Sequence, residues 1–166
     1  MAMNSRGILV SNIVTSREVK KLEKIITNLD LQLGILPERS NAIGNNFLVN
    51  DNGGFCNERL SKQSKVESEK IFEVDITSQS LNGMDTLGMI GCANTKGGLC
   101  HPEISDNEKE VMEKVLKVPV MEGTVNFGMP LVGAGIISSC PPAESISSLM
   151  MFSILRRDRK ANGKYE

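Results

Sequence analysis

The stretch Gly53-Gly54-Phe55-Cys56-Asn57 returns 44 positions later as Gly97-Gly98-Leu99-Cys100-His101, and Arg6-Gly7-Ile8-Leu9-Val10 is a degenerate earlier copy. A second marker keeps the same phase. Ala42-Ile43-Gly44-Asn45 matches Thr86-Leu87-Gly88-Met89 and Leu131-Val132-Gly133-Ala134, so its glycines are 44 and 45 positions apart. Two independent markers that share one period predict an internal structural repeat.

Each repeat is expected to contain a glycine turn, a strand, a polar turn, a helix and a second strand. The helices are expected over residues 16–29, 62–72 and 105–118. Ser16 predicts a simple N-terminal cap without an acidic partner, whereas Ser105 and Glu108 have the spacing of a capping box. The second helix is polar and weakly patterned.

Strands are expected after the helices, over residues 31–36, 73–76 and 118–121. The apolar runs 46–49, 89–93 and 132–138 are short and β-branched, which favours strands over helices. Repeats of this length cannot bury their own apolar faces, so neighbours must stack or close around an axis. The sequence therefore predicts an α/β array.

Composition sets further limits. A chain of 166 residues suits one domain or an array of small repeats, and its net charge of -1 gives no overall attraction to nucleic acid. The sequence contains no run of about 18 apolar residues and no signal-peptide core, so an intracellular protein without membrane contact is expected. The four cysteines lack Cys-x-x-Cys spacing, and His101 alone cannot complete a zinc site. We therefore expect free, mostly buried thiols, no metal and no cofactor.

Several segments, in this order and spacing, resemble the initiation factor 6 family of archaea and eukaryotes. The resemblance runs from about Arg6 to Ser139. The segments that carry it are Gly7-Ile8-Leu9-Val10, Glu38-Arg39-Ser40-Asn41-Ala42-Ile43-Gly44-Asn45, Asn94-Thr95-Lys96-Gly97-Gly98-Leu99-Cys100-His101-Pro102, Leu116-Lys117-Val118-Pro119-Val120, Gly123-Thr124-Val125-Asn126-Phe127-Gly128 and Val132-Gly133-Ala134-Gly135.

The resemblance implies a pentein fold, in which five repeats close around a pseudo-fivefold axis. It also implies a translation factor without catalytic activity that binds the joining face of the large ribosomal subunit. The contact would be a ribosomal protein near the sarcin–ricin loop, with ribosomal RNA contact possible, and would block association with the small subunit. A role in large-subunit biogenesis, a monomeric state and a cytoplasmic location (also nucleolar in a eukaryote) follow from the same resemblance.

The chain departs from the family at both ends. About three repeats are recognisable, so a pentein-like array that forms an open or incomplete ring is one expectation, and residues 1–142 are assigned to it. Residues 143–166 are assigned to a divergent C-terminal segment with a charged tail. That tail could contact RNA phosphates or be a solvated end.

Candidate ribosome contacts lie in the loops of the repeats, because loops on rigid scaffolds usually carry function. Asn45 is the first choice, and Asn126 is assigned to the equivalent loop two repeats later. The full set is Asn41, Asn45, Thr86, Thr124, Asn126, Phe127 and Gly128. The alternative is that these polar side chains satisfy turn backbone.

Other repeated residues favour structural roles. Gly44, Gly88 and Gly133 indicate a backbone that needs positive φ or close packing. Cys56 and Cys100 fall at one repeat position, which favours packing, and the same reasoning pairs His101 with Asn57 as polar turn residues.

Two rival functions remain open. The pentein fold also hosts guanidine-modifying enzymes, which need a thiolate, a histidine base and carboxylates. Here His101 is the sole histidine, and Cys140 is the sole late candidate nucleophile. The second rival is a degenerate repeat protein that acts as a protein-interaction module.

Overall fold

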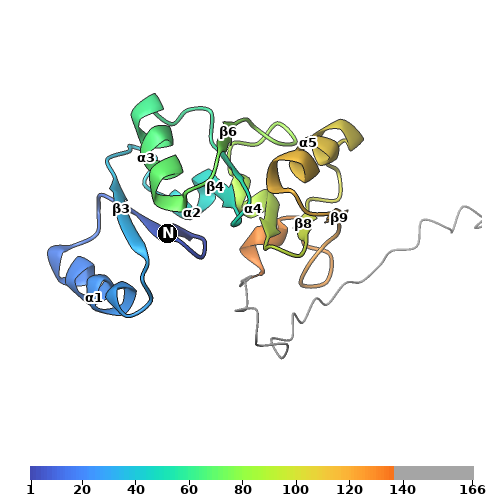
Figure 1. The fold of residues 1–166 in the computed structure, drawn as a ribbon. Coiled ribbons are helices and arrows are strands. Elements are labelled where there is room, and N and C mark those ends of the chain that lie inside the picture. Colours follow the sequence, from blue (N-terminus) through green and yellow to red (C-terminus); the bar gives the residue numbers. More distant parts are fainter. Residues whose placement is uncertain (137–166) are drawn as a thin grey trace, which may run out of the picture.

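The computed structural model describes residues 1–136, which form three similar units arranged in an arc (Figure 1). The first unit contains β1 (Ala2–Met3), β2 (Gly7–Ser11), α1 (Ser16–Thr27) and β3 (Gln32–Leu36). The second contains α2 (Ile43–Asn46), β4 (Phe47–Val49), β5 (Gly54–Cys56), α3 (Lys62–Phe72) and β6 (Ile76–Ser78). The third contains α4 (Leu87–Ile90), β7 (Gly91–Ala93), β8 (Gly98–Cys100), α5 (Asp106–Leu116) and β9 (Val120–Glu122), and the 3-10 helix η1 (Val132–Ala134) follows.

Each unit has one three-stranded sheet with the same topology. The first two strands are antiparallel neighbours, and the helix then crosses over to a third strand that is parallel to the middle one. Equivalent register pairs are Gly54 with Ile76 and Gly98 with Val120. The predicted α/β repeat is confirmed, and in the second and third units the first strand of the sheet falls within the predicted apolar runs 46–49 and 89–93. Within residues 1–136 the three units do not form a closed ring.

The helix predictions are largely confirmed. The weakly patterned second helix spans the expected residues, and the Ser105–Glu108 capping box is present at α5. The expected simple cap at Ser16 is wrong. Thr15 is the N-cap of α1, and its hydroxyl and main-chain N–H are joined reciprocally with Glu18 in a full capping box.

Two of the predicted strands begin too early. Glu73 and Lys117 end α3 and α5 in the left-handed conformation, at φ 52° and 53°, and the chain becomes extended only after them. The strands are therefore β6 and β9 as given above, not residues 73–76 and 118–121.

The apolar runs also differ from the prediction. Residues 47–49 and 91–93 are strands, but each follows a single helical turn, α2 or α4. The expected strand over residues 132–138 is contradicted at 132–134, where η1 forms; residues 137–138 lie outside the described part. Each short helix places its glycine against the backbone of the preceding short helix or, for Gly44, of Met1.

The short helices touch through their glycines. A Cβ atom on Gly88 would overlap the carbonyl oxygen of Gly44, and one on Gly133 would overlap that of Gly88. None of the three glycines has positive φ. The predicted backbone requirement is therefore close packing between units.

A second contact between units uses buried asparagines in the hairpin turns. Asn4 Nδ2 donates to the carbonyl oxygen of Phe72 at 2.8 Å, and Asn50 Nδ2 donates to that of Leu116 at 2.9 Å. The side-chain oxygen of each asparagine accepts the N–H groups two and three residues later, which closes its own turn. The same turn bonds form at Asn94.

The apolar core runs through all three units, with the largest cluster between the second and third. The outer side of the first unit lacks such a partner among the described residues. Leu29 of that unit is 61% exposed, whereas its equivalents Phe72 and Leu116 are fully buried.

Cys56 and Cys100 are buried and free, and Cys92 is partly buried and free. The packing role predicted for the first two is confirmed.

Within residues 1–136, no helix has the length and apolar character needed to cross a membrane. The predicted boundary at residue 142, the divergent segment 143–166 and Cys140 all lie outside the described residues.

Candidate functional site: the face of the short helices

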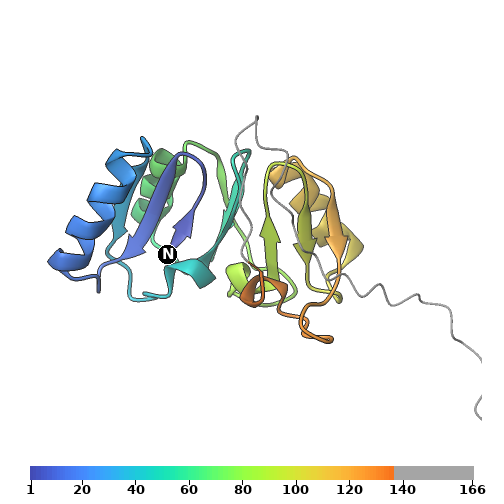
Figure 2. The same ribbon diagram turned by 90° about the horizontal axis from the view of Figure 1, so that it is seen from below.

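One face of the arc is built from α2, α4, η1 and the connections that lead into them; we call it the short-helix face. Figure 2 shows these three elements along the same edge, in teal, lime and orange, with the hairpin turns at the opposite edge. All seven predicted contact residues lie in these helices and connections. The sequence therefore placed its candidates on one face.

A groove of about 560 Å³ crosses this face at the boundary of the second and third units. Its walls come from α2 and its approach, from the loop after β5, and from the loop before α4. Among the predicted residues, it contains Asn45 and Thr86. The lining residues are Ser40, Ala42, Asn45, Asn46, Asn57, Arg59, Met84, Asp85 and Thr86.

Asn45 and Asn46 both line this groove, but their side chains have different roles. Asn46 is 2% exposed, and its amide donates to the Ser40 carbonyl at 2.7 Å and accepts from the Ser40 hydroxyl at 3.0 Å. Asn46 therefore fixes the backbone that leads into α2. The half-buried Asn45 side chain makes no hydrogen bond within the described residues. Its amide is free to serve an outside partner.

Most of the remaining residues of the groove are polar, and Ala42 and Met84 are the apolar ones. Thr86 precedes α4, and its side chain makes no capping bond. Arg59 and Asp85 form an ion pair of 2.8 Å at the rim, in which the arginine side chain is 82% exposed. Asn41 lies outside the groove, is exposed, and donates its main-chain N–H to Arg39 at 3.0 Å. The groove thus offers amides, hydroxyls and one neutralised ion pair.

Thr124, Asn126, Phe127 and Gly128 lie in the turn between β9 and η1. Main-chain bonds between Val125 and Met129, at 2.9 and 2.7 Å, close this turn. Its structural equivalent is the turn 81–84, so Asn126 corresponds to Asn82. The prediction that Asn126 matches Asn45 is wrong in position, because Asn126 lies in the connection before η1 whereas Asn45 lies within α2.

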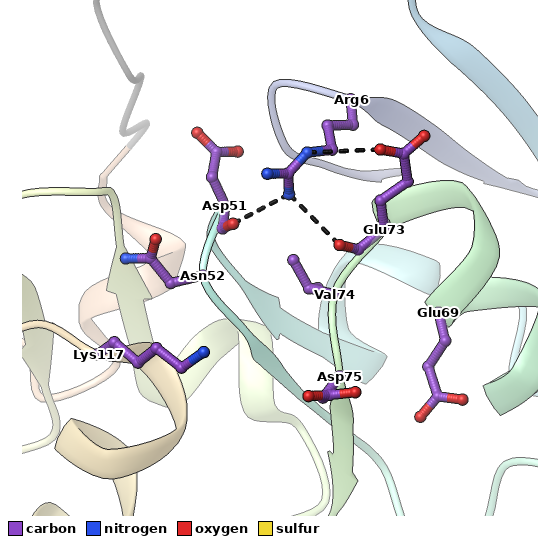
Figure 3. Close-up of a pocket in the computed structure, with 8 residues that line it drawn as sticks. All are labelled: Arg6, Asp51, Asn52, Glu69, Glu73, Val74, Asp75 and Lys117. Atoms are coloured by element: carbon purple, nitrogen blue, oxygen red, sulfur yellow. Dashed lines mark hydrogen bonds and ion pairs between the residues drawn. The ribbon is translucent and has the colours of Figure 1, made fainter.

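The opposite face carries a hollow that sequence reasoning missed, of about 470 Å³ (Figure 3). Arg6 lies across it and donates to the Asp51 carbonyl at 3.0 Å, with an ion pair of 3.6 Å to Glu73. Glu69, Asp75 and Lys117 project around it. Residues from all three units line this hollow. Because these residues are far apart in the sequence, their clustering could not be predicted from it.

The described thiols do not suit nucleophilic chemistry. Burial raises the pKa of Cys92 to about 11 and that of Cys100 to about 12, and burial also raises the pKa of Cys56. A thiol with such a pKa stays protonated near neutral pH, whereas attack requires the thiolate. His101 Nδ1 lies 3.3 Å from Asn82 Nδ2 and accepts the Glu103 N–H. His101 is a buried polar residue in a turn, like Asn57, as predicted.

A model of the eIF-6 family matches residues 1–140. The chain belongs to the eIF-6 family. A relative from Archaeoglobus fulgidus, translation initiation factor 6, is 42% identical over 139 residues, which cover 84% of this chain and 62% of that protein.

Two further eIF-6 relatives extend the comparison. The translation initiation factor 6 of Natronomonas pharaonis is 43% identical over 136 residues, covering 82% of this chain and 60% of that protein. The eukaryotic translation initiation factor 6 of Encephalitozoon cuniculi is 29% identical over 136 residues, covering 82% and 56%. The chain therefore spans between 56% and 62% of the length of the eIF-6 relatives it matches here.

Proposed function

We propose that this chain is a translation factor that binds the joining face of the large ribosomal subunit and sterically prevents association with the small subunit. The contact is a ribosomal protein near the sarcin–ricin loop, with ribosomal RNA as a secondary contact. The protein acts as a monomer without catalytic activity, in the cytoplasm (also the nucleolus in a eukaryote), and takes part in large-subunit biogenesis. Membership of the eIF-6 family supports this proposal.

The short-helix face is the surface that binds. The observation that carries this assignment is the Asn45 side chain, which lines the groove without a hydrogen-bond partner among the described residues. A half-buried amide gains most from a partner that supplies both a donor and an acceptor, as a polypeptide backbone does. Asn41, Thr86, Thr124, Asn126, Phe127 and Gly128 are proposed to extend the same contact.

Rigidity suits this face to occlusion. Gly44, Gly88 and Gly133 lock the short helices against one another, and Asn46 fixes the approach to α2. A preformed surface loses little conformational entropy on binding. Such a surface blocks a second subunit by its bulk, so neither a nucleophile nor a metal is needed.

Co-sedimentation with isolated large subunits tests the proposal. The parent chain is expected to bind with one copy per subunit, and Asn45→Ala is expected to bind about tenfold more weakly, because polar groups of the bound subunit lose the Asn45 amide as their hydrogen-bond partner. Asn107→Ala is the matched control, since Asn107 is exposed on α5 and does not line the groove. Absence of binding by the folded parent chain would refute the proposal, and equal binding by the Asn45 variant would refute the assigned face.

A further inference from the structure

The turn between β9 and η1 presents one aromatic side chain directly to solvent. Phe127 is fully exposed, at 101% of its reference area, and its φ is 63°. Asn126 and Gly128 on either side also have positive φ, at 47° and 107°. Left-handed backbone is unfavourable for a bulky side chain, so this residue costs stability without adding any packing in return.

The equivalent turn one unit earlier, residues 81–84, adopts a similar left-handed backbone without a bulky side chain. Asn82 and Gly83 occupy it with φ of 50° and 66°, nearly the values of Asn126 and Phe127. Main-chain bonds between Leu81 and Met84 close it around two residues, whereas those between Val125 and Met129 enclose three, so Gly128 is an additional residue in the later turn. Glycine therefore fits the second position without strain, and the fold alone gives no reason for phenylalanine there. Strain that the fold does not need points to function.

The surroundings of Phe127 indicate what it contacts. Residues 123–135 contain no charged side chain, and the neighbouring Met129 is 44% exposed. Sites that stack aromatic rings on nucleic acid bases combine them with lysine or arginine for the phosphates. An uncharged turn with two exposed apolar side chains instead suits an apolar pocket on a protein.

We propose that Phe127 is the anchor through which the short-helix face docks into an apolar pocket on a protein partner. The inference rests on the proposed function and names protein, not RNA, as the contact at this turn. The strained turn holds the ring outward before binding, and a phenylalanine side chain has only two torsion angles to fix. The cost of ordering it is therefore small.

Three variants test the anchor by binding to purified large subunits. Phe127→Gly removes the ring and relieves the strain, so we expect about thirtyfold weaker binding together with a melting temperature at or above that of the parent. Phe127→Leu keeps an apolar side chain, so we expect less than about fivefold weaker binding. Val66→Ala, on the exposed side of α3, is the control and should bind like the parent.

The outcomes separate this inference from the proposed function. If the parent binds and the glycine variant binds equally well, Phe127 is not an anchor. If the leucine variant loses as much affinity as the glycine variant, the ring stacks on a base and the protein contact is wrong. If the folded parent chain does not bind, the proposed function is refuted, and so is the inference that Phe127 is an anchor.

Discussion

Asn50 Nδ2 donates to the Leu116 carbonyl oxygen at 2.9 Å and thereby joins the hairpin turn of the second unit to the end of α5 in the third. The amide also donates to the Asn94 carbonyl at 3.1 Å. Asn4 repeats both contacts one unit earlier, with Phe72 and with Asn50 itself. These buried asparagines therefore connect neighbouring units through hydrogen bonds.

Asn50→Ala tests that connection. Asn50 is 2% exposed, and its loss leaves two turn N–H groups without their acceptor and removes one of the two amide donors to the Leu116 carbonyl. We expect a loss of about 2–4 kcal/mol in the free energy of unfolding, measured by urea denaturation. Asn107→Ala, on the surface, should change it by less than about 0.5 kcal/mol. A similar small change at Asn50 would show that the bonds contribute little.

Gly88→Ala tests the close approach of the short helices. The added methyl group would overlap the Gly44 carbonyl oxygen, which is main chain and cannot rotate away. We expect destabilisation of about 3 kcal/mol or more, or failure to fold, as judged by thermal denaturation. Gly97→Ala is the control, because a Cβ there would lie 3.6 Å from its nearest neighbour, the Pro119 carbonyl oxygen. Equal tolerance at both glycines would contradict the packing account.

The ionisation of Glu108 is expected to make the free energy of unfolding depend on pH. Burial opposes its ionisation, but hydrogen bonds from the Ser105 hydroxyl and from the Asn82 and Ser105 N–H groups outweigh burial and hold the pKa of Glu108 below 4.5. A lowered folded-state pKa contributes stability above the unfolded-state pKa, and this contribution is lost as the pH falls through the folded-state value.

The measurement compares Glu108→Gln with the parent chain by urea denaturation across the acid range. The variant should be less stable than the parent at about pH 7, and the difference should shrink as the pH falls through the folded-state pKa of Glu108, because below it the carboxyl group is protonated in both states. Glu103→Gln serves as an exposed control. A difference that stays constant with pH would show that the effect does not depend on the charge.

Leu29 and Leu116 occupy equivalent positions, each directly before a left-handed residue (Asp30 or Lys117), but have different surroundings. Leu116 is fully buried, so Leu116→Ala should cost about 2–5 kcal/mol of unfolding free energy. Leu29 is 61% exposed, so Leu29→Ala should cost less than about 0.5 kcal/mol. A large cost at Leu29, measured by the same denaturation, would mean that another unit or another copy covers the outer side of the first unit.

Local signals predicted the features that depend on nearby residues. The period of Gly44, Gly88 and Gly133 gave the repeat, and the Ser105–Glu108 spacing gave the start of α5. Thr15 and Glu18 have the same spacing, so the capping box of α1 could also have been predicted from the sequence. The cap was instead assigned to Ser16, one residue too late.

The remaining features depend on residues distant in sequence. The bonds made by Asn4 and Asn50 span 44 to 68 positions, so their spacing gave no sign of a partner. The sequence selected Asn45 because of its place in a predicted loop, but only the fold shows that the Asn46 amide turns to Ser40 while Asn45 lines the groove. The contact residues on the short-helix face remain predictions.

Subunit joining, followed by light scattering, tests the central claim most directly. Purified large and small ribosomal subunits are mixed with increasing amounts of the folded chain, with Asn45→Ala and Asn107→Ala in parallel. We predict that joining falls as the chain approaches one copy per large subunit, that the Asn45 variant needs about tenfold more protein, and that the Asn107 variant behaves like the parent. Undiminished joining at saturating amounts of the folded parent chain would contradict the account.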